Sequence, residues 1–430
     1  MDSDVVIVGG GIAGISCALE IASLGITVTI VEEGPSIGGK MIMLDKTFPT
    51  LDCSSCILTP KMAEVSSNSR ISLLTLSKLV EVQRDRDSDF LVKVLSLPRY
   101  VDERKCTACG ACADVCAMKG RVPDEFNLFM SKRGAIYLPF PQAVPQKYLI
   151  DSSSCLYLTK GKCKRRCEEV CQRKAIDFTE LKRITEIRCR AIVIATGFDL
   201  IDASQIKEFG YGRIPSVLTS LEFERILSAT GPTNGEIVIG GKVPKRFYFV
   251  QCVGSRDSQR GVRYCSRVCC MYTAKHAFIV KERIKDAKIW ISYIDVRAYG
   301  KGYEEFFKTV QEAGVLYIKG IPGEIVNKGE TLLVKVEDML SGQVSEIEVD
   351  VAVLALGVKP KEGIFDLKRM IGVQLDEYGF VKVDPQRSSK TNISGVFVCG
   401  FASGPKDIPD VVAHATEASA SVIEYIKGKR

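Results

Sequence analysis

The strongest constraint on the fold of this chain lies near residue 1, where a continuous apolar run is followed by three spaced glycines. Residues 4–8 read Asp-Val-Val-Ile-Val, which is typical of a buried parallel strand, and Gly9, Gly11 and Gly14 complete a G-x-G-x-x-G turn. These glycines permit a tight turn and close approach to a pyrophosphate, and the helix predicted over 12–24 offers free N–H groups to phosphates. The pattern predicts a dinucleotide-binding βαβ unit.

The residues after this helix support the prediction. A second strand is expected over 26–31, and Glu32 follows it about twenty residues after the fingerprint, where a carboxylate can bind ribose hydroxyls. The stretch from Glu32 to Gly38-Gly39, with Lys40 beside it, resembles the extended motif of two-dinucleotide-binding flavoproteins. This resemblance favours FAD over NAD as the bound dinucleotide.

Two later segments agree with a flavoprotein. The segment from Ala191 to Thr196-Gly197 resembles a strand and Ala-Thr-Gly turn of that superfamily, and the strand leading to Gly400 resembles its C-terminal flavin strand. Many members carry Asp after that last glycine, whereas this chain has Phe401. A flavin contact at this point must therefore come from another group.

Composition limits the functions open to the chain. Its 430 residues, 46% of them hydrophobic, suit two or three domains. The net charge of +7 is modest, and no long basic block with interleaved aromatic residues indicates nucleic acid. No apolar run approaches the roughly 20 residues of a membrane span, and the first strand leaves no room for a signal peptide, so we expect a cytoplasmic protein. The chain has only two histidines, His276 and His414, which disfavours a hydrolase with a Ser-His-Asp triad.

The 17 cysteines gather at metal-ligand spacings, and this favours iron–sulfur ligation. From Cys106 to Cys116 the spacing is C-x2-C-x2-C-x3-C, in which three thiolates hold one cubane and the fourth ligates another. In a two-cluster ferredoxin arrangement, one [4Fe–4S] cluster is expected on Cys106, Cys109, Cys112 and Cys171. The other is expected on Cys155, Cys163, Cys167 and Cys116. The alternatives are structural zinc, and packing cysteines in the second, irregularly spaced set.

A further group of cysteines lies in a second region that is expected to bind a nucleotide. Strands are predicted over 246–252, 288–294 and 349–356, yet the turn that begins at Gln251 lacks a G-x-G-x-x-G fingerprint. In its place stand four thiols, at Cys252, Cys265, Cys269 and Cys270. One helical turn would separate Cys265 from Cys269, and adjacent Cys269 and Cys270 do not easily form a disulfide, so a shared metal cluster is geometrically reasonable.

Taken together, four motifs resemble the A-subunit of heterodisulfide reductase. They are FPTLDCSSCILTPKM (48–62), CVGSRD (252–257), YCSRVCCMYTAKH (264–276) and GPKDIP (404–409). The resemblance implies a thioredoxin-reductase-like α/β flavoprotein with two dinucleotide-binding domains, an inserted α+β ferredoxin-like domain, and a [4Fe–4S] cluster near the flavin on the last four cysteines. It also makes Lys275 a candidate to approach the flavin and stabilise its reduced anion; an ordinary surface lysine is the alternative.

The resemblance also implies partners and an activity. The chain is expected to be an iron–sulfur flavoprotein oxidoreductase that passes electrons between FAD, three [4Fe–4S] clusters and partner subunits of a heterodisulfide reductase-like complex. Heterodisulfide chemistry itself belongs to a partner. Ferredoxin or another redox protein is a further candidate partner, and a homodimer within the complex is suggested. The chain starts at the flavin fingerprint and ends at Arg430, which resembles a short form of the family.

Two other functions remain open. Cys53 and Cys56 form a C-x-x-C roughly where flavin disulfide reductases place a redox dithiol, so an NAD(P)H-dependent disulfide reductase is the main alternative. The other is a structural iron–sulfur scaffold without turnover. Cys17, Cys189 and Cys399 fall in helix or strand patterns and are expected in the core.

The expected domains follow from these motifs. They are an FAD-binding domain in three parts (1–97, 179–225 and 367–430), a ferredoxin-like insertion (98–178), and an NAD(P)H-domain-like region that carries a cluster (226–366).

Overall fold

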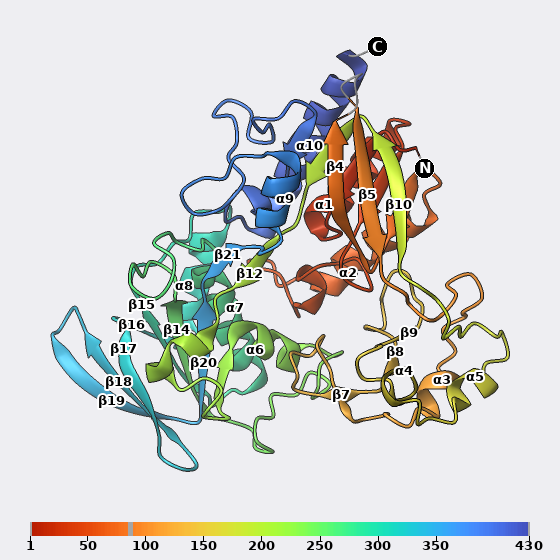
Figure 1. Cartoon of the computed structure of the whole chain (residues 1–430). Helices are drawn as coiled ribbons and strands as arrows, with labels where there is room; N and C mark the ends of the chain where they lie inside the picture. The colour runs from red at the N-terminus through yellow and green to blue at the C-terminus, as the bar shows by residue number, and fades with distance from the viewer. Residues whose placement is uncertain (1, 85–88, 429–430) are drawn as a thin grey trace.

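The protein was analysed as a computed structural model, which describes residues 2–84 and 89–428. Figure 1 shows two lobes and an appended region. The first lobe contains both ends of the chain, the second contains residues from about 217 to 356, and the insertion, residues 97–182, lies between two strands of the first lobe. Within the described residues, no helix has the length and apolar character required to cross a lipid bilayer.

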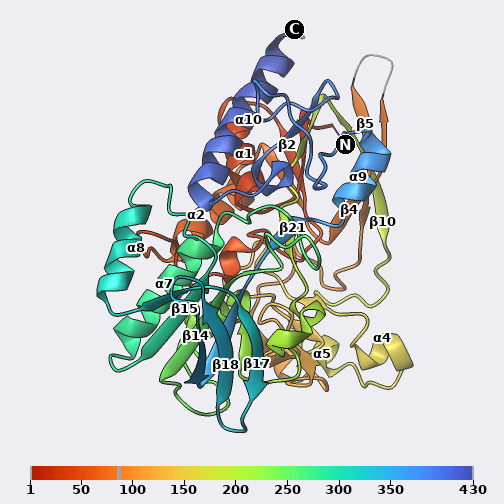
Figure 2. The ribbon, with the colours of Figure 1, turned by 90° about the vertical axis from the view of Figure 1, so that its left-hand side faces the viewer.

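The first lobe is built on a five-stranded parallel sheet in the order β22-β11-β1-β2-β3. Its strands are β1 (Val5–Val8), β2 (Val28–Val31), β3 (Ile71–Leu74), β11 (Ala191–Ile194) and β22 (Val396–Val398). One face is covered by α1 (Ile12–Ser23), α2 (Ser54–Ser67) and α10 (Ile408–Gly428). Figure 2 shows α1 and α10 side by side. The predicted first two strands and first helix are confirmed, with ends shifted by one or two residues, and the strand expected within 391–400 is the shorter β22.

An antiparallel sheet in the order β10-β5-β4 covers the other face. It consists of β4 (Ser77–Arg84), β5 (Phe90–Ser96) and β10 (Arg183–Cys189). The short α9 (Ile364–Ile371) packs against β4. Because both faces of the parallel sheet are covered, its strands are apolar throughout rather than alternating.

The second lobe repeats the parallel architecture in the order β13-β20-β14-β15-β16. These strands are β13 (Val217–Thr219), β14 (Arg246–Val253), β15 (Lys288–Tyr293), β16 (Leu316–Lys319) and β20 (Val351–Leu356). On one face lie α6 (Ser220–Leu227), α7 (Cys269–Arg283) and α8 (Tyr303–Glu312). The other face is covered by an antiparallel sheet of β17 (Pro322–Asn327), β18 (Leu332–Asp338) and β19 (Gln343–Val349).

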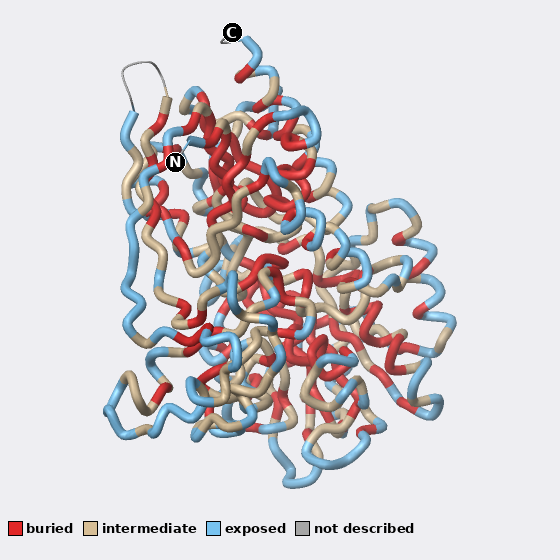
Figure 3. Tube along the Cα trace, turned by 90° about the vertical axis from the view of Figure 1, so that its right-hand side faces the viewer, coloured by how far each residue is buried: buried red, intermediate tan, exposed pale blue. Residues whose placement is uncertain are grey.

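Two short strands join the lobes. They are β12 (Phe198–Leu200) and β21 (Val358–Pro360), which pair antiparallel. They place the carboxyl ends of both parallel sheets near the junction of the lobes, which is where ligands bind in open α/β sheets. Figure 3 shows that buried residues concentrate in the sheets of the two lobes.

The insertion contains little regular structure. It has three short helices, α3 (Ala111–Asp114), α4 (Leu156–Lys160) and α5 (Arg166–Glu169). Two ribbons pair β6 (Val122–Pro123) with β7 (Lys132–Arg133) and β8 (Ile136–Tyr137) with β9 (Leu149–Ile150). Its small apolar core includes Ile136 and Ile150, and half-buried cysteines pack against it. A core of this size usually needs added staples such as metal clusters.

Candidate functional site

A cavity of about 1210 Å³ extends from the fingerprint turn of the first lobe to α6 and α7 of the second. Its volume exceeds the roughly 300–1,000 Å³ of ordinary ligand pockets, so it has room for a long dinucleotide. Seven of the ten residues predicted to bind the cofactor line it: Gly9, Gly11, Glu32, Gly39, Lys40, Thr196 and Gly197. The other three, Gly14, Gly38 and Gly400, do not line the cavity.

Backbone atoms lie so close to Gly9 and Gly14 in the fingerprint turn that a residue with a side chain does not fit at either position. Gly9 has φ +112°, and a Cβ there would lie 2.3 Å from the carbonyl oxygen of Ala195. A Cβ on Gly14 would lie 2.0 Å from the Gly9 oxygen. Gly11 precedes the first turn of α1, and no side chain caps that turn. Its N–H groups therefore face a cradle that can accept a pyrophosphate.

The Glu32 carboxylate holds the turn closed. Its Oε2 accepts a hydrogen bond from the Gly10 N–H and its Oε1 one from the Gly34 N–H, each at 2.7 Å. Burial raises the pKa of Glu32, and these two bonds act in the opposite direction. The side chain stands on the cavity wall, and its contact with a ribose remains a prediction.

The middle of the cavity offers further polar groups. The Thr196 hydroxyl is buried without a hydrogen-bond partner, as expected of a group that meets a ligand. Lys40 Nζ donates to the Phe198 carbonyl oxygen at 2.6 Å and pairs with Asp199 at 3.7 Å. Phe401, where many flavoproteins carry Asp, packs against Phe198 with ring centres 4.2 Å apart. These features fit FAD.

The four cysteines of the second lobe come together at the carboxyl end of its sheet. Cys252 lies near the end of β14, at the switch point between β14 and β20, and Cys269 and Cys270 are the first two residues of α7. We call Cys252, Cys265, Cys269 and Cys270 the second-lobe quartet. The predicted helical turn between Cys265 and Cys269 is wrong, because Cys265 lies in the loop before α7.

The backbone of that loop explains the error. Arg267 has φ +70°, in the left-handed region that residues other than glycine rarely adopt, and this conformation interrupts a helix. Cys252, in β14, also has a positive φ of +60°. The pKa of Cys252 is raised to about 12, first by burial and then by the thiols of Cys270 and Cys265. The thiols are thus close enough to repel one another as thiolates, the arrangement that a bound metal cluster would relieve.

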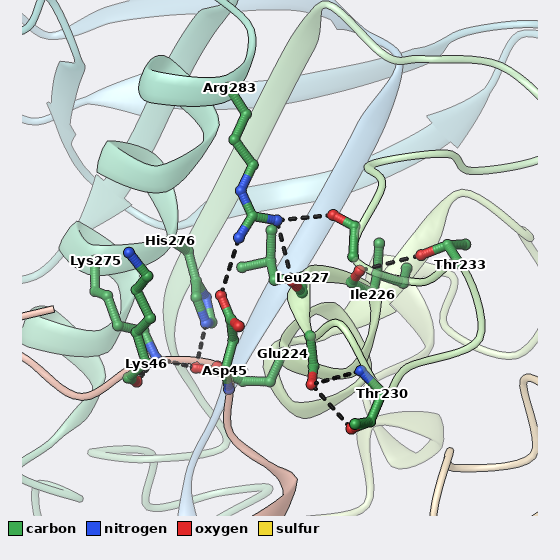
Figure 4. Close-up of polar contacts among 12 residues, drawn as sticks. Asp45, Lys46, Glu224, Ile226, Leu227, Thr230, Thr233, Lys275, His276 and Arg283 are labelled. Atoms are coloured by element: carbon green, nitrogen blue, oxygen red, sulfur yellow. Dashed lines mark hydrogen bonds and ion pairs between the residues drawn. The ribbon is translucent and has the colours of Figure 1, made fainter. Parts of the chain in front are cut away.

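A buried polar network joins α6 and α7 on the wall of the cavity (Figure 4). Lys275 of α7 forms an ion pair with Glu224 of α6 and donates to the Lys46 carbonyl oxygen at 2.7 Å. His276 Nε2 lies 2.5 Å from Glu224 Oε1. Burial alone would raise the pKa of Glu224, but Lys275 and His276 outweigh it and hold that pKa at about 2.

Sequence reasoning found Lys275 and missed Glu224. Both line the cavity, and Lys275 is buried rather than on the surface; its contact with the flavin stays a prediction. Glu224 Oε2 also accepts from the Asp45 N–H at 3.0 Å, and Asp45 pairs with Arg283 at 3.2 Å (Figure 4). The α6 segment contains three charged residues, Glu222, Glu224 and Arg225, and nothing in the sequence distinguishes Glu224 from the other two or reveals its partners.

The insertion brings its second cysteine set together with one cysteine of the first. A cavity of about 290 Å³ is lined by the four predicted ligands Cys116, Cys155, Cys163 and Cys167. The pKa of Cys167 is raised to about 11, first by burial and then by the other three thiols. Cys112 lies similarly beside Cys106 and Cys109. Residues 2–84 and 89–428 contain no group of three or more Cys, His, Asp or Glu packed for a single metal ion.

Cys53 and Cys56 are joined by a disulfide at the start of α2. Cys53 is the N-cap residue, and its Sγ accepts from the Cys56 N–H at 3.2 Å. Cys56 is exposed, whereas the neighbouring Asp52 and Ile57 line the large cavity. Cys17, Cys189 and Cys399 are buried in the core of the first lobe, as predicted.

Comparison with solved structures defines the class of protein. The fold resembles thioredoxin reductase of T. acidophilum, with a TM-score of 0.56 and 16% identity over 100% of this chain and 99% of the other. For the enzyme of Lactococcus lactis the TM-score is 0.54 with 13% identity, covering 99% of each chain. Residues 4–41 match the family described as FAD dependent oxidoreductase, and residues 303–419 match pyridine nucleotide-disulphide oxidoreductase. The chain is a flavoprotein with two dinucleotide-binding domains.

Comparison with curated sequences defines the family. The chain is 43% identical to the A-subunit of the H(2):CoB-CoM heterodisulfide,ferredoxin reductase of Methanothermobacter marburgensis, over 100% of this chain and 65% of that protein. It is 46% identical to the second iron-sulfur A-subunit of the CoB–CoM heterodisulfide reductase of Methanopyrus kandleri, over 96% of this chain and 63% of that protein. The chain belongs to the heterodisulfide reductase A-subunit family. It spans just under two thirds of the length of these relatives.

Proposed function

We propose that this chain is the FAD and [4Fe–4S] electron-transfer subunit of a heterodisulfide reductase or a related complex. In this function it is an iron–sulfur flavoprotein oxidoreductase that passes electrons between the flavin and partner iron–sulfur subunits. The observation that supports it most is that Val268, Tyr272 and Lys275, from the segment that carries the second-lobe quartet, line the flavin cavity itself. Electrons can then pass between flavin and cluster without a diffusing carrier.

Three [4Fe–4S] clusters are proposed, one on the second-lobe quartet and two in the insertion. The thiol groupings around Cys112, Cys167 and Cys252 support this count. Bound flavin would supply two-electron chemistry and bound clusters one-electron chemistry. The side chains hold and insulate these groups, and Lys275 would place a cation beside the flavin. The division into five domain segments expected from the sequence, the homodimer and ferredoxin as a partner belong to the same proposal.

The test is the iron, acid-labile sulfide and FAD content of anaerobically purified protein, with electron paramagnetic resonance of the reduced sample. We expect about 12 iron per FAD, falling by about four in Cys269→Ser. A Cys189→Ser variant, which changes a buried core thiol, is the matched control and should keep all its iron. FAD without iron would contradict the proposal.

The disulfide between Cys53 and Cys56 favours a second candidate, an NAD(P)H-dependent flavin disulfide reductase. The second lobe lacks a dinucleotide fingerprint after β14, and buried thiols stand at its switch point instead. Rapid reduction of the flavin by NADPH, followed by transfer of the electron pair to the disulfide that is lost in Cys56→Ser, would support this candidate. Absence of any NAD(P)H reaction would leave the electron-transfer function.

A further inference from the structure

The first turn of α10 connects the flavin cavity to the second lobe. Asp407 caps this helix, because its Oδ1 accepts from the Asp410 N–H at 2.9 Å. Its Oδ2 accepts from the Tyr303 hydroxyl at 2.6 Å, and Tyr303 is the first residue of α8. The neighbouring Ile408 and Val411 line the cavity. One carboxylate therefore fastens the second lobe to the helix that borders the flavin.

A second contact joins the same turn to the cysteine loop. Arg267 lies between Cys265 and Cys269, and its N–H donates to Cys265 Sγ at 3.3 Å. Its side chain forms an ion pair with Asp410 and lies over the Tyr299 ring, 5.0 Å from the ring centre. The ionic contact joins Arg267 Nη2 to Asp410 Oδ2, and neither Arg267 Nε nor Asp410 Oδ2 has a hydrogen-bond partner among the described residues.

The exposure of this pair shows that stability is not its main effect. The side chains of Arg267 and Asp410 are 32% and 42% exposed. Exposed ion pairs contribute little to folding stability, because solvent screens them and ordering the side chains costs entropy. Arg267 nevertheless holds a left-handed backbone conformation at φ +70°, which costs energy and persists only where neighbouring contacts fix it. The main effect of the pair is therefore on the position of one loop.

We propose that the ion pair Arg267–Asp410 and the hydrogen bond Tyr303–Asp407 form a clamp that fixes the second-lobe quartet against the flavin cavity. The clamp rests on the proposed function, because it presumes a flavin in the cavity and a cluster on the quartet. Arg267, Asp410 and Tyr303 are then positioning residues for electron transfer between the two. Electron transfer slows as the distance between flavin and cluster increases, so a displaced cysteine loop lowers its rate.

The clamp predicts slow internal electron transfer in variants that keep both cofactors but lack one of its contacts. Single electrons are injected into the full chain by laser flash from photoreduced 5-deazariboflavin, with EDTA as the sacrificial donor. Each injected electron then redistributes between flavin and cluster, and absorbance of the two groups gives a first-order rate. We expect Arg267→Gln, Asp410→Asn and Tyr303→Phe each to lower this rate severalfold. Their iron and FAD contents should equal those of the unaltered protein.

A double variant that exchanges the two charges of the ion pair distinguishes a positioning role from general damage to the structure. The double variant Arg267→Asp with Asp410→Arg should recover most of the lost rate, because it restores an ion pair of opposite polarity. Lys245→Gln, which breaks a surface pair with Asp286 elsewhere in the second lobe, is the control and should leave the rate unchanged. Single variants as fast as the unaltered protein, or a charge exchange as slow as the single variants, would overturn the clamp. Unaltered protein without iron would instead contradict the proposed function.

Discussion

Glu224 and Lys275 form an ion pair between α6 and α7 in which the two side chains are only 3% and 2% exposed. Burying two charges is costly, and the Asp45 N–H and the Lys46 carbonyl oxygen provide the hydrogen bonds that offset this cost. The pair also stands on the wall of the flavin cavity. It links the stability of the junction between the lobes to the charge beside the flavin.

Breaking this pair should destabilise the protein strongly. Glu224→Gln leaves the Lys275 ammonium buried without a counter-charge, so we expect the free energy of unfolding to fall by about 3–5 kcal/mol. Denaturant unfolding under anaerobic conditions measures it. The double variant Glu224→Gln with Lys275→Met should recover much of the loss, whereas the exposed Glu236→Gln should change little. A loss below about 1 kcal/mol in the single variant would show that the pair is not a stabilising contact.

The same carboxylate should make stability depend on pH in acid. The pKa of Glu224 is about 2 in the folded protein and ordinarily 4.5. Between these two pH values Glu224 is protonated in the unfolded chain but ionised in the folded protein. The stabilisation by Glu224 is therefore complete above about pH 4.5 and is lost as pH falls toward 2. Unfolding free energies between about pH 6 and about pH 3 measure this slope. Glu224→Gln should have a shallower slope, and an equal slope would assign the acid loss to other groups.

Adding a side chain at the fingerprint turn should weaken flavin binding. In Gly14→Ala the new methyl group would meet the Gly9 oxygen, 2.0 Å away before any shift, so α1 must move from the turn. We expect the dissociation constant for FAD to rise by at least about tenfold, which is about 1.4 kcal/mol. Fluorescence titration of FAD into deflavinated protein measures it. Gly323→Ala, where a Cβ meets no atom within 4 Å, should bind FAD normally.

The insertion offers a test of cluster pairing. Cys116 belongs by spacing to the first motif, yet it lines a cavity with Cys155, Cys163 and Cys167. Cys116→Ser and Cys163→Ser should therefore remove the same paramagnetic signal. Cys109→Ser should remove a different one. Loss of different signals from the first two variants would show that Cys116 binds the other cluster.

The disulfide at α2 should be dispensable for the metal sites. In Cys56→Ser we expect unchanged iron and FAD, and one new thiol at Cys53 that alkylation and mass spectrometry detect. Cys53 remains the N-cap of α2 in this variant, so the helix should persist. Loss of a cluster in Cys56→Ser would instead make Cys56 a ligand.

The sequence by itself determined the features whose physics is local. A left-handed turn at Gly9 and a C-x2-C-x2-C-x3-C spacing are fixed by backbone geometry over a few residues, so the fingerprint and the cysteine sets could be predicted. The two-lobed fold followed from the same signals. The loop between Cys265 and Cys269 could not be predicted, because contacts with α10 hold Arg267 away from helix.

Only the tertiary structure decided which distant groups meet. Glu224 and Lys275 are separated by 51 residues, and Tyr303 and Asp407 by 104. The sequence does not show whether a charged residue is surrounded by water or by a buried partner. The cost of burying the charge depends on the groups that the fold brings to it. The packing of α6 against α7 therefore created the buried pair, and the packing of the second lobe on the first created the placement of the quartet beside the cavity and the clamp.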